Sequence, residues 1–261
     1  MSLHLIQGLA VEDAGTGPVV VCVHGLGGTS NTWSPILSSF EGFRLIRLDL
    51  PGCGRSSGST VDINIQDLLS CLQVVCRTLS IDSAHWIGHS MGTIICQHLA
   101  ANTPSLVKSM LLFGPLVAPA DAAREPLRIR SQKIRESGLS GMQEVADTLL
   151  NTAVSRHTRD HNPAAFAFVR ESLMRQAPIA YADYCLALSQ MRAADIQRID
   201  MPTLLITGDE DLVATPDAVD LMVRRMPGAR RMVVNRCGHW TPIERPHECI
   251  RATREFLKRH A

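Results

Sequence analysis

Short runs of apolar, β-branched residues alternate with segments of helical length, and this alternation limits the fold more than any other feature of the chain. Near-continuous apolar strands separated by helices are typical of a parallel sheet that helices cover on both faces. The sequence therefore predicts an α/β fold, with Leu3–Glu12 as an antiparallel edge strand and Pro246–His260 as a closing helix. The strand-like runs are Pro18–Val23, Phe43–Leu48, His85–Ile87, Val107–Phe113, Thr203–Thr207 and Arg231–Val234.

The alternation stops between residues 119 and 195, where amphipathic helical segments follow one another without a strand-like run. A simple crossover between parallel strands needs far fewer residues than this. We therefore predict a core domain made of residues 1–118 and 196–261, and an inserted helical cap at 119–195. The alternative is an extended α/β domain with larger crossover helices.

Composition excludes several classes of partner. The formal net charge is +1, so nothing favours binding to nucleic acid or to an anionic membrane. Aromatic residues make up only 4% of the chain, which argues against platforms for base stacking. No apolar run approaches the length of a membrane-spanning helix, and the first residues do not resemble a signal peptide. We expect a cytoplasmic protein with a small-molecule substrate, and a homo-oligomer remains open.

Eight cysteines are spread along the chain without a C-x-x-C pair, most of them in apolar surroundings. This pattern is typical of reduced, buried thiols in a cytosolic protein. No spacing of cysteine and histidine matches a metal site, so we expect neither a metal nor a cofactor.

Gly88-His89-Ser90-Met91-Gly92 is a G-x-S-x-G pentapeptide between an apolar run and a segment of helical character. In a strand–turn–helix context this motif forms a nucleophile elbow, which strains the serine backbone and exposes its hydroxyl above the sheet. Ser90 is therefore the predicted nucleophile. His89 is expected to point away from it, and His85 to lie at the surface or against a helix.

A serine hydroxyl needs an adjacent base, and the base needs a carboxylate that holds its tautomer. His239 follows the last predicted strand and is the expected base. Three acids after the preceding strand compete for the third role: Asp209, Glu210 and Asp211. We favour Asp211, because the loop has turned toward the histidine at that point, with Asp209 as the second choice.

The oxyanion formed in such chemistry is stabilised by backbone N–H groups. We expect one from Met91, which follows the nucleophile, and one from Leu26 in the glycine-rich loop after the first long parallel strand. His24 is expected to brace that loop, and Asp49 and Arg55 to brace the backbone around the site. An ordinary glycine-rich turn is the alternative.

These motifs together resemble the α/β-hydrolase superfamily over nearly the whole chain. The resemblance implies the α/β-hydrolase fold, a triad of Ser90, Asp211 and His239, and oxyanion donors at Leu26 and Met91. Within the superfamily the chain is most similar to the 3-oxoadipate enol-lactonase group, through the acid loop Asp211–Pro216, the residues Ile243–Arg245 and the stretch Gly141–Asp147. Thr93 departs from it, because many relatives carry a glycine there.

Pocket residues are less clearly marked. Trp33, Leu212 and Trp240 are candidates for substrate binding, with core packing as the alternative, above all for Trp33. The predicted cap is rich in arginine, and we expect at least one to face the pocket, where a substrate carboxylate would be its counter-ion. These arginines are Arg124, Arg128, Arg130, Arg135, Arg156, Arg159, Arg170, Arg175 and Arg192.

The predicted function is a serine hydrolase that cleaves a carboxylic ester or lactone, such as a carboxylated enol-lactone. Two alternatives use the same scaffold. The first is other chemistry at the same serine, as in cofactor-free haloperoxidases or C–C hydrolases. The second is a receptor that binds its ligand without turnover.

Overall fold

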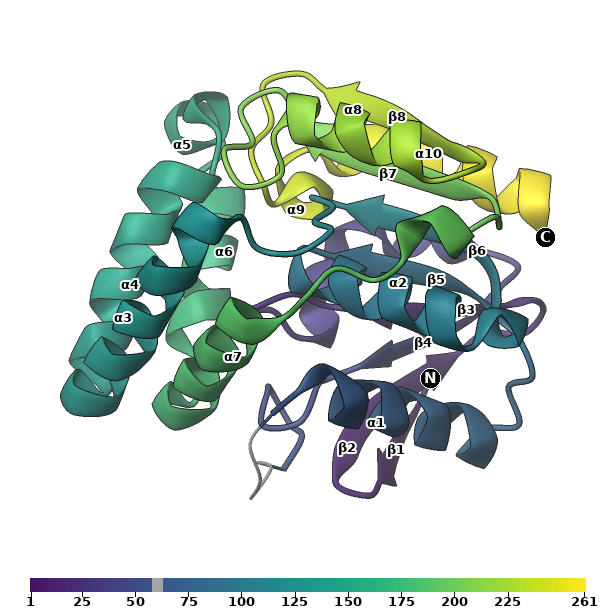
Figure 1. The fold of residues 1–261 in the computed structure, drawn as a ribbon, viewed down its shortest axis with the longest axis horizontal. Helices are drawn as coiled ribbons and strands as arrows, with labels where there is room; N and C mark the ends of the chain where they lie inside the picture. The colour runs from purple at the N-terminus through teal and green to yellow at the C-terminus, as the bar shows by residue number, and fades with distance from the viewer. Residues whose placement is uncertain (58–62) are drawn as a thin grey trace.

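The computed structural model describes residues 1–57 and 63–261, and its centre is a sheet of eight strands (Figure 1). The order across the sheet is β1-β2-β4-β3-β5-β6-β7-β8, and neighbours from β4 to β8 run parallel. Central strands such as VVVCV are β-branched and buried on both sides, which confirms the predicted α/β class. The bounds are β1 Ser2–Ile6, β2 Leu9–Ala14, β3 Val19–Val23, β4 Arg44–Leu48, β5 Ala84–His89, β6 Val107–Phe113, β7 Thr203–Gly208 and β8 Ala229–Val234.

The N-terminal segment corrects one prediction. Instead of one edge strand over Leu3–Glu12, the chain forms an antiparallel hairpin of β1 and β2, and β2 continues antiparallel onto β4. Gln7 and Gly8 form the turn with φ of 49° and 83°. Two successive positive φ angles match the right-handed twist of a hairpin. A glutamine at the first of these positions is an unusual signal, so the turn was not predicted.

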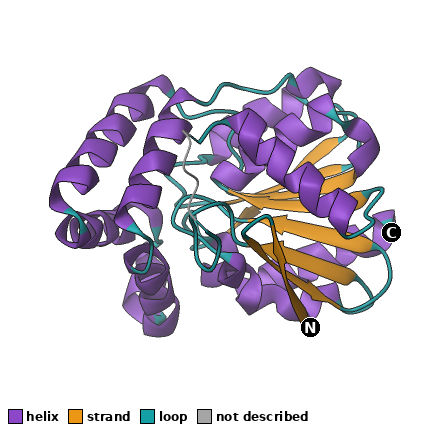
Figure 2. Ribbon diagram, turned by 90° about the horizontal axis from the view of Figure 1, so that it is seen from below, coloured by secondary structure: helices purple, strands orange, loops and turns teal. Residues whose placement is uncertain are grey.

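Helices cover both faces of the sheet, as Figure 2 shows. Alternate side chains of β3 divide between two core clusters: Val21 and Val23 face one, and Val20 and Cys22 face the other. The first cluster includes residues of α1 (Ile65–Thr78), α2 (Met91–Asn102) and α8 (Pro216–Arg225). The second includes residues of η1 (Ser30–Phe40) and α10 (Pro246–His260), so the predicted closing helix is present.

Five helices follow one another between β6 and β7 in the part of the chain that the structure describes. We call residues 121–190 the helical segment. It lies to one side of the sheet in Figure 1, next to the ends of the strands that carry the predicted site. Its division from the rest as a cap domain at 119–195 stays a prediction. The helices are α3 Asp121–Ser137, α4 Leu139–Ala153, α5 Arg156–His161, α6 Pro163–Met174 and α7 Pro178–Gln190.

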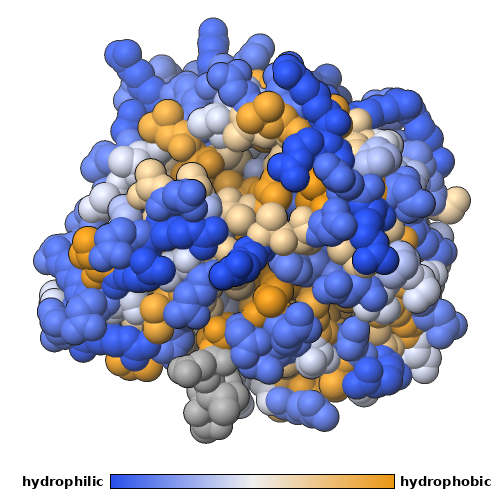
Figure 3. Space-filling model, in the orientation of Figure 1, coloured by the Kyte–Doolittle hydropathy of each residue, from blue (hydrophilic) through white to orange (hydrophobic). Residues whose placement is uncertain are grey.

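The face drawn in Figure 3 is mostly hydrophilic, with hydrophobic side chains in separate patches between charged ones. Helices that cover a sheet are expected to look like this, because their apolar stripe faces inward. Within residues 1–57 and 63–261, no helix has both the length and the apolar character that crossing a membrane requires.

Candidate active site

Ser90 lies between β5 and α2 with φ 52° and ψ −120°, in a region that residues other than glycine rarely adopt. Two close approaches impose this turn. A side-chain carbon on Gly88 would lie 2.8 Å from the Gly92 carbonyl oxygen, and one on Gly92 would lie 2.2 Å from the Val23 carbonyl oxygen. Such strain costs on the order of 1–3 kcal/mol and persists because the packed sheet and helix impose it. The sequence thus folds locally into a strand, a sharp turn and a helix.

A continuous chain of hydrogen bonds joins Ser90, His239 and Asp211. The Ser90 hydroxyl lies 2.8 Å from Nε2 of His239, and Nδ1 of His239 lies 2.8 Å from Oδ2 of Asp211. Because the carboxylate only accepts, Nδ1 carries the proton, and Nε2 is left to accept from the serine hydroxyl. Asp211 and His239 are 2% and 5% exposed, so the chain is largely removed from water.

The Asp211 carboxylate is also held by its own loop. Its Oδ1 accepts the N–H groups of Val213 and Ala214, both at 2.8 Å, and the Thr207 hydroxyl donates to its Oδ2. Burial acts to raise the pKa of this carboxyl, but the adjacent His239 and the backbone N–H groups outweigh burial and lower the pKa below its ordinary value. Asp211 is therefore an anion at neutral pH.

The two competing acids have other partners. Asp209 accepts the N–H of Cys237 at 3.0 Å through Oδ1, and so closes the turn between the two loops that follow β7 and β8. Glu210 accepts the N–H of Arg156 at 2.7 Å, at the start of α5. The structure brings only Asp211 to the histidine, as the sequence interpretation favoured.

The loop after β3 lies directly against the nucleophile. A side-chain carbon on Gly25 would be 2.8 Å from Cβ of Ser90. Met91 is the first residue of α2, so its N–H has no acceptor within the helix. The Leu26 N–H makes no hydrogen bond within the described part of the chain. Both N–H groups predicted as oxyanion donors are thus adjacent to Ser90 in the chain or in space, and neither donates to another group among residues 1–57 and 63–261.

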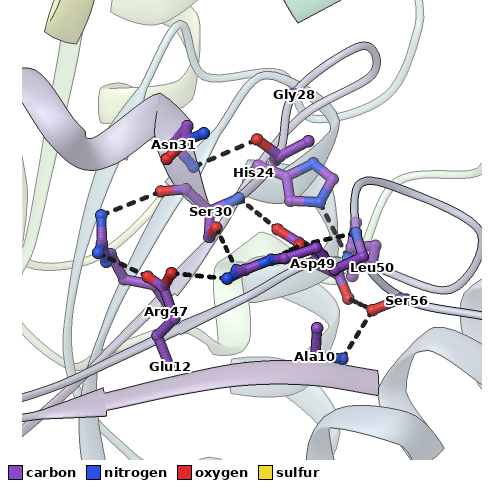
Figure 4. A network of polar contacts seen from close by, with 12 residues as sticks. Ala10, Glu12, His24, Gly28, Ser30, Asn31, Arg47, Asp49, Leu50 and Ser56 are labelled. Carbon is purple, nitrogen blue, oxygen red and sulfur yellow. Dashed lines mark hydrogen bonds and ion pairs between the residues drawn. The ribbon is translucent and has the colours of Figure 1, made fainter. Parts of the chain in front are cut away.

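A buried polar network lies beneath this loop (Figure 4). Leu50 donates its N–H to Nε2 of His24 at 3.0 Å, so Nδ1 of His24 carries the proton and donates to the Gly25 carbonyl at 2.8 Å. The burial of His24 lowers its pKa, which keeps it neutral. Asp49 accepts the N–H of Ser30 at 2.7 Å. As expected from the sequence, His24 and Asp49 brace the loop from the side of the core.

Arg55 extends this network to the edge of the sheet. Its guanidinium contacts Oδ2 of Asp49 and Oε1 of Glu12, both at 2.9 Å, and Glu12 also pairs with Arg47. Burial acts to raise the pKa of Asp49. The pKa is nevertheless lowered, because hydrogen bonds from the N–H groups of Ser30 and Arg55 and from the Arg55 guanidinium outweigh the effect of burial. The bracing role predicted for Arg55 matches these contacts, whereas Glu12 and Arg47 were not foreseen.

Glu244 is a further residue that the sequence interpretation missed as part of the site. Its carboxylate is 1% exposed and accepts the N–H groups of Gly238 and Trp240, which flank His239, both at 3.1 Å. It also accepts the N–H of Ser155 from the helical segment at 2.9 Å. Glu244 therefore joins the loop of residues 235–240, which we call the histidine loop, to the helical segment. The only signal in the sequence is an acid five residues after the histidine, within Ile243–Arg245.

His89 packs against His239. It is wholly buried, its Nε2 lies 3.0 Å from the carbonyl oxygen of His239, and its ring lies 5.2 Å from that of His239. Burial and the nearby His239 lower the pKa of His89 to about 3. His89 thus supports the histidine loop as a neutral ring. His85 is buried with its Nδ1 2.8 Å from the Ser109 hydroxyl, so of its two expected settings the surface is excluded and packing against a helix remains.

The fold and this arrangement agree with comparisons to known proteins. A family model described as "alpha/beta hydrolase fold" matches residues 18–160, which is more than half of the chain. The chain belongs to this family. The superfamily resemblance predicted from the motifs is confirmed, and two curated relatives of this α/β hydrolase are named as hydrolases.

Two curated relatives cover nearly the whole chain. A 2-hydroxy-6-oxononadienedioate/2-hydroxy-6-oxononatrienedioate hydrolase from Burkholderia vietnamiensis is 28% identical over 95% of this chain and 90% of its own. An (E)-2-((N-methylformamido)methylene)succinate hydrolase from Acinetobacter baylyi is 23% identical over 94% of this chain and 92% of its own.

Two solved structures share the fold. A malate-bound thermophilic esterase from Thermogutta terrifontis superposes with a TM-score of 0.91 at 24% identity, covering 97% of this chain and 94% of its own. The enol-lactonase from Burkholderia xenovorans superposes with a TM-score of 0.88 at 24% identity, covering 98% and 100%.

The predicted pocket residues of this α/β hydrolase lie in three different settings. Trp33 is fully buried in the second core cluster, with its ring 6.2 Å from that of Phe113, so it packs in the core as the alternative interpretation allowed, and substrate binding by it stays a prediction. Leu212 is 72% exposed on the acid loop. Trp240 is buried with its ring 5.0 Å from that of His89. Substrate binding by Leu212 and Trp240 stays a prediction.

Most arginines of the helical segment have partners of their own. Ion pairs or carbonyl contacts engage Arg124, Arg128, Arg135, Arg156, Arg159 and Arg170. Arg130 differs, because it is half-buried and lies beside the hydroxyl of Tyr181. Burial raises the pKa of Tyr181, and the nearby Arg130 only partly offsets this rise. The loop after β3, residues 24–28, is called the oxyanion loop below. The Tyr181 ring lies close to Gly27 of this loop. Arg130 therefore lies beside a residue whose ring borders the loop of Gly27.

A cavity of about 570 Å³ lies at the opposite ends of the strands, between the starts of β7 and β8 and the end of α10. None of the predicted site residues lines it. In residues 1–57 and 63–261, no group of three or more His, Cys, Asp or Glu side chains is arranged to hold a metal ion.

Proposed function

We propose that this protein is a serine hydrolase that cleaves a carboxylic ester or lactone. The observation that carries the proposal is the chain of hydrogen bonds from Ser90 through His239 to Asp211, beside two backbone N–H groups that have no acceptor in the described part of the chain. A carboxylate, a histidine with the correct tautomer and a strained, partly exposed serine are the parts that this route of acyl transfer uses.

In the proposed mechanism the Ser90 hydroxyl attacks the carbonyl carbon of the substrate. Nε2 of His239 takes the hydroxyl proton and later donates it to the leaving oxygen. Asp211 holds Nδ1–H and stabilises the imidazolium that forms. The N–H groups of Leu26 and Met91 bind the oxyanion, which is where preorganised donors have their largest effect. A water molecule then attacks the acyl carbon while Nε2 of His239 takes its proton; the C–O bond to Ser90 breaks, and His239 returns the proton to the Ser90 oxygen as the acid is released.

The substrate class that we propose carries a second, free carboxylate. Two relatives are named as hydrolases of a dienedioate and a succinate, and one structural neighbour binds malate. Arg130 is half-buried beside a neutral phenol and forms no ion pair with the residues that the structure describes, and a guanidinium pairs well with a carboxylate. A carboxylated lactone such as a 3-oxoadipate enol-lactone fits this class.

A second candidate is hydrolysis of a carbon–carbon bond in a 2-hydroxy-6-oxo-dienedioate, which the name of the relative from Burkholderia vietnamiensis favours. The same serine, base and oxyanion site would serve, so product analysis must separate the two reactions. Turnover of such a dienedioate more than tenfold faster than any ester would select this candidate.

The test uses two esters of equal chain length, p-nitrophenyl hexanoate and mono-p-nitrophenyl adipate, with a fluorophosphonate label. We expect the label on Ser90 and a preference for the adipate ester. Ser90→Ala should lower turnover of both esters by at least about 1,000-fold, because loss of a triad member removes the nucleophilic route. Ser140→Ala, on the exposed surface of α4, is the control.

Three outcomes are decisive. If Ser90→Ala keeps more than a tenth of the wild-type rate, the assignment of the nucleophile fails. Equal turnover of both esters would contradict the proposed preference for a substrate with a free carboxylate, and the protein would then be a general esterase. If the wild-type protein is neither labelled nor active toward any ester, the receptor alternative replaces the enzyme.

A further inference from the structure

The oxyanion loop is held from above by the helical segment. The Gly27 carbonyl accepts the Ser172 hydroxyl at 2.7 Å and the Gln176 side-chain amide at 3.2 Å. The same amide reaches the Gly28 carbonyl at 3.4 Å and the Ser172 carbonyl at 2.8 Å. Ser172 is in the last turn of α6, and Gln176 follows the end of that helix. Both lone pairs of the Gly27 carbonyl are therefore filled by one element of the helical segment.

The contact is a close fit. Gln176 is only 4% exposed, so its amide would be costly to bury without acceptors. Gly27 has φ 76°, and a side-chain carbon on it would lie 2.5 Å from Cδ2 of Leu173. Only a glycine allows α6 to approach the loop this closely.

The turn that presents Leu26 depends on these same peptides. Gly28 donates its N–H to the Gly25 carbonyl at 3.0 Å, which closes a four-residue turn with Leu26 and Gly27 at its centre. The positive φ of Gly27 at the third position is typical of a type II turn. Rotation of the Gly27 peptides would break this turn and change the direction of the Leu26 N–H.

The core side of the loop does not supply this restraint. His24 holds the Gly25 carbonyl, and Asp49 holds the N–H of Ser30 (Figure 4), so these contacts act on the ends of the loop. Between them lie Gly27 and Gly28, the residue type with the greatest backbone freedom. The side chains that fix their carbonyls are Ser172 and Gln176.

We propose that Ser172 and Gln176 are positioning residues of the oxyanion hole. They fix the carbonyls of the two glycines and thereby keep the Leu26 N–H aimed at the site beside Ser90. The helical segment then completes the catalytic geometry as well as covering it, and its undocking would switch off oxyanion binding. The inference rests on the proposed function, since it concerns a step of that reaction.

Two substitutions remove the donors and keep the volume: Ser172→Ala and Gln176→Met. The readouts are the rate of the acylation burst with p-nitrophenyl acetate, its pH midpoint, and amide hydrogen exchange across residues 25–28. Removing one oxyanion donor outright costs about 100- to 1,000-fold, so we expect a misaimed donor to slow acylation about 10- to 100-fold in the double variant. The pH midpoint should not change, because neither residue contacts His239.

The matched controls are Ser140→Ala and Gln143→Met, on exposed positions of α4. Ser172→Thr, which keeps the hydroxyl, should restore most of the rate lost in Ser172→Ala. Exchange should become faster at residues 25–28, while α3, α4 and α7 keep their protection. If Gln176→Met does not fold, the comparison of Ser172→Ala with Ser172→Thr carries the test, since Ser172 is partly exposed.

If the wild-type protein is labelled at Ser90 and the double variant acylates at the same rate as the wild type, the inference is overturned and the proposed function stays intact. Faster exchange throughout the helical segment, or a shifted pH midpoint, also overturns it, because the two residues would then support the fold in general. A wild-type protein without a burst or a label overturns the proposed function itself.

Discussion

Charged side chains are used differently in the sheet half of the molecule and in the helical segment. Around the sheet, Asp49, Asp211 and Glu244 are each no more than 2% exposed, and each accepts hydrogen bonds from loop N–H groups. In the helical segment, ion pairs such as Lys133–Glu144 and Arg170–Asp147 join side chains that are 39% exposed or more.

This difference shows how each region acts on the site. Buried carboxylates with several N–H donors hold a loop in one conformation, because release would leave a charge without partners. Exposed ion pairs contribute between about 0 and 1 kcal/mol each and hold nothing in place. The helical segment therefore acts on the site through a few neutral contacts, such as Gln176 on Gly27, and through the N–H of Ser155 on Glu244.

The largest effect is expected from a change of Asp211, the buried carboxylate that contacts His239 in the sheet half. Asp211→Asn should lower kcat for ester hydrolysis by about 100- to 10,000-fold, because the amide favours the wrong tautomer of His239. Asp209→Asn keeps an oxygen acceptor for the Cys237 N–H, and we expect less than a threefold change. Steady-state kinetics at one pH measure both. A larger loss from Asp209→Asn would reverse the choice between the two acids.

A smaller effect is expected where the two regions meet. Glu244→Gln replaces one carboxylate oxygen by an N–H₂ group, which cannot accept a hydrogen bond. The donors of that oxygen then lose their acceptor: Ser155 and Gly238 at Oε2, or Trp240 at Oε1. Loss of hydrogen bonds to a charged acceptor should lower the free energy of unfolding by about 3 kcal/mol, as measured by urea denaturation. Turnover should fall about tenfold through the displaced His239, by the logic of misplaced catalytic groups.

The control for this change is Glu255→Gln, an exposed acid of α10 that pairs with Arg259. It should alter neither stability nor turnover measurably. Equal stability of Glu244→Gln and the wild type would show that Glu244 does not join the two regions.

Acid should weaken the sheet half first, and this is the smallest of the effects. Burial lowers the pKa of His89 to about 3 and of His85 to about 4, from an ordinary value of 6.5. Between the folded pKa of each histidine and 6.5, the unfolded chain binds a proton that the folded chain does not. The free energy of unfolding therefore rises with pH in this range and decreases as pH falls below about 6.5. Asp49 and Asp211, whose pKa values are lowered, act in a separate window, because their contribution is present above 3.8 and is lost below it.

Linkage gives the size of this effect for one histidine. A histidine that stays neutral when folded costs about 2 kcal/mol between pH 7 and pH 5. His89→Gln should remove about that much of the pH dependence in urea unfolding, whereas the exposed His161→Gln in the helical segment should not. Identical pH slopes for wild type and His89→Gln would show that His89 is not the group that resists protonation.

Local rules explain which parts of the site were predictable. Ser90, Asp211 and His239 each follow a strand of a parallel sheet, and the carboxyl ends of such strands meet at one edge. The structure brings these three together, and it places the Leu26 loop against Ser90, although their catalytic roles stay proposals. The same rules did not extend to Gln7–Gly8, where the turn has a weak signal, or to Trp33, where an aromatic side chain fits a core and a pocket equally well.

The sequence by itself determined the α/β class, the strand ends and the residue types of the site, because periodicity and tight-turn glycines are local properties of the chain. Only the tertiary structure decided that Glu244 holds the histidine loop and that Ser172 and Gln176 hold the oxyanion loop. Gln176 lies 149 residues from Gly27 along the chain, and no motif records such a contact. The physical reason is that a buried carbonyl accepts from any donor that packing brings within reach, whatever its position in the sequence.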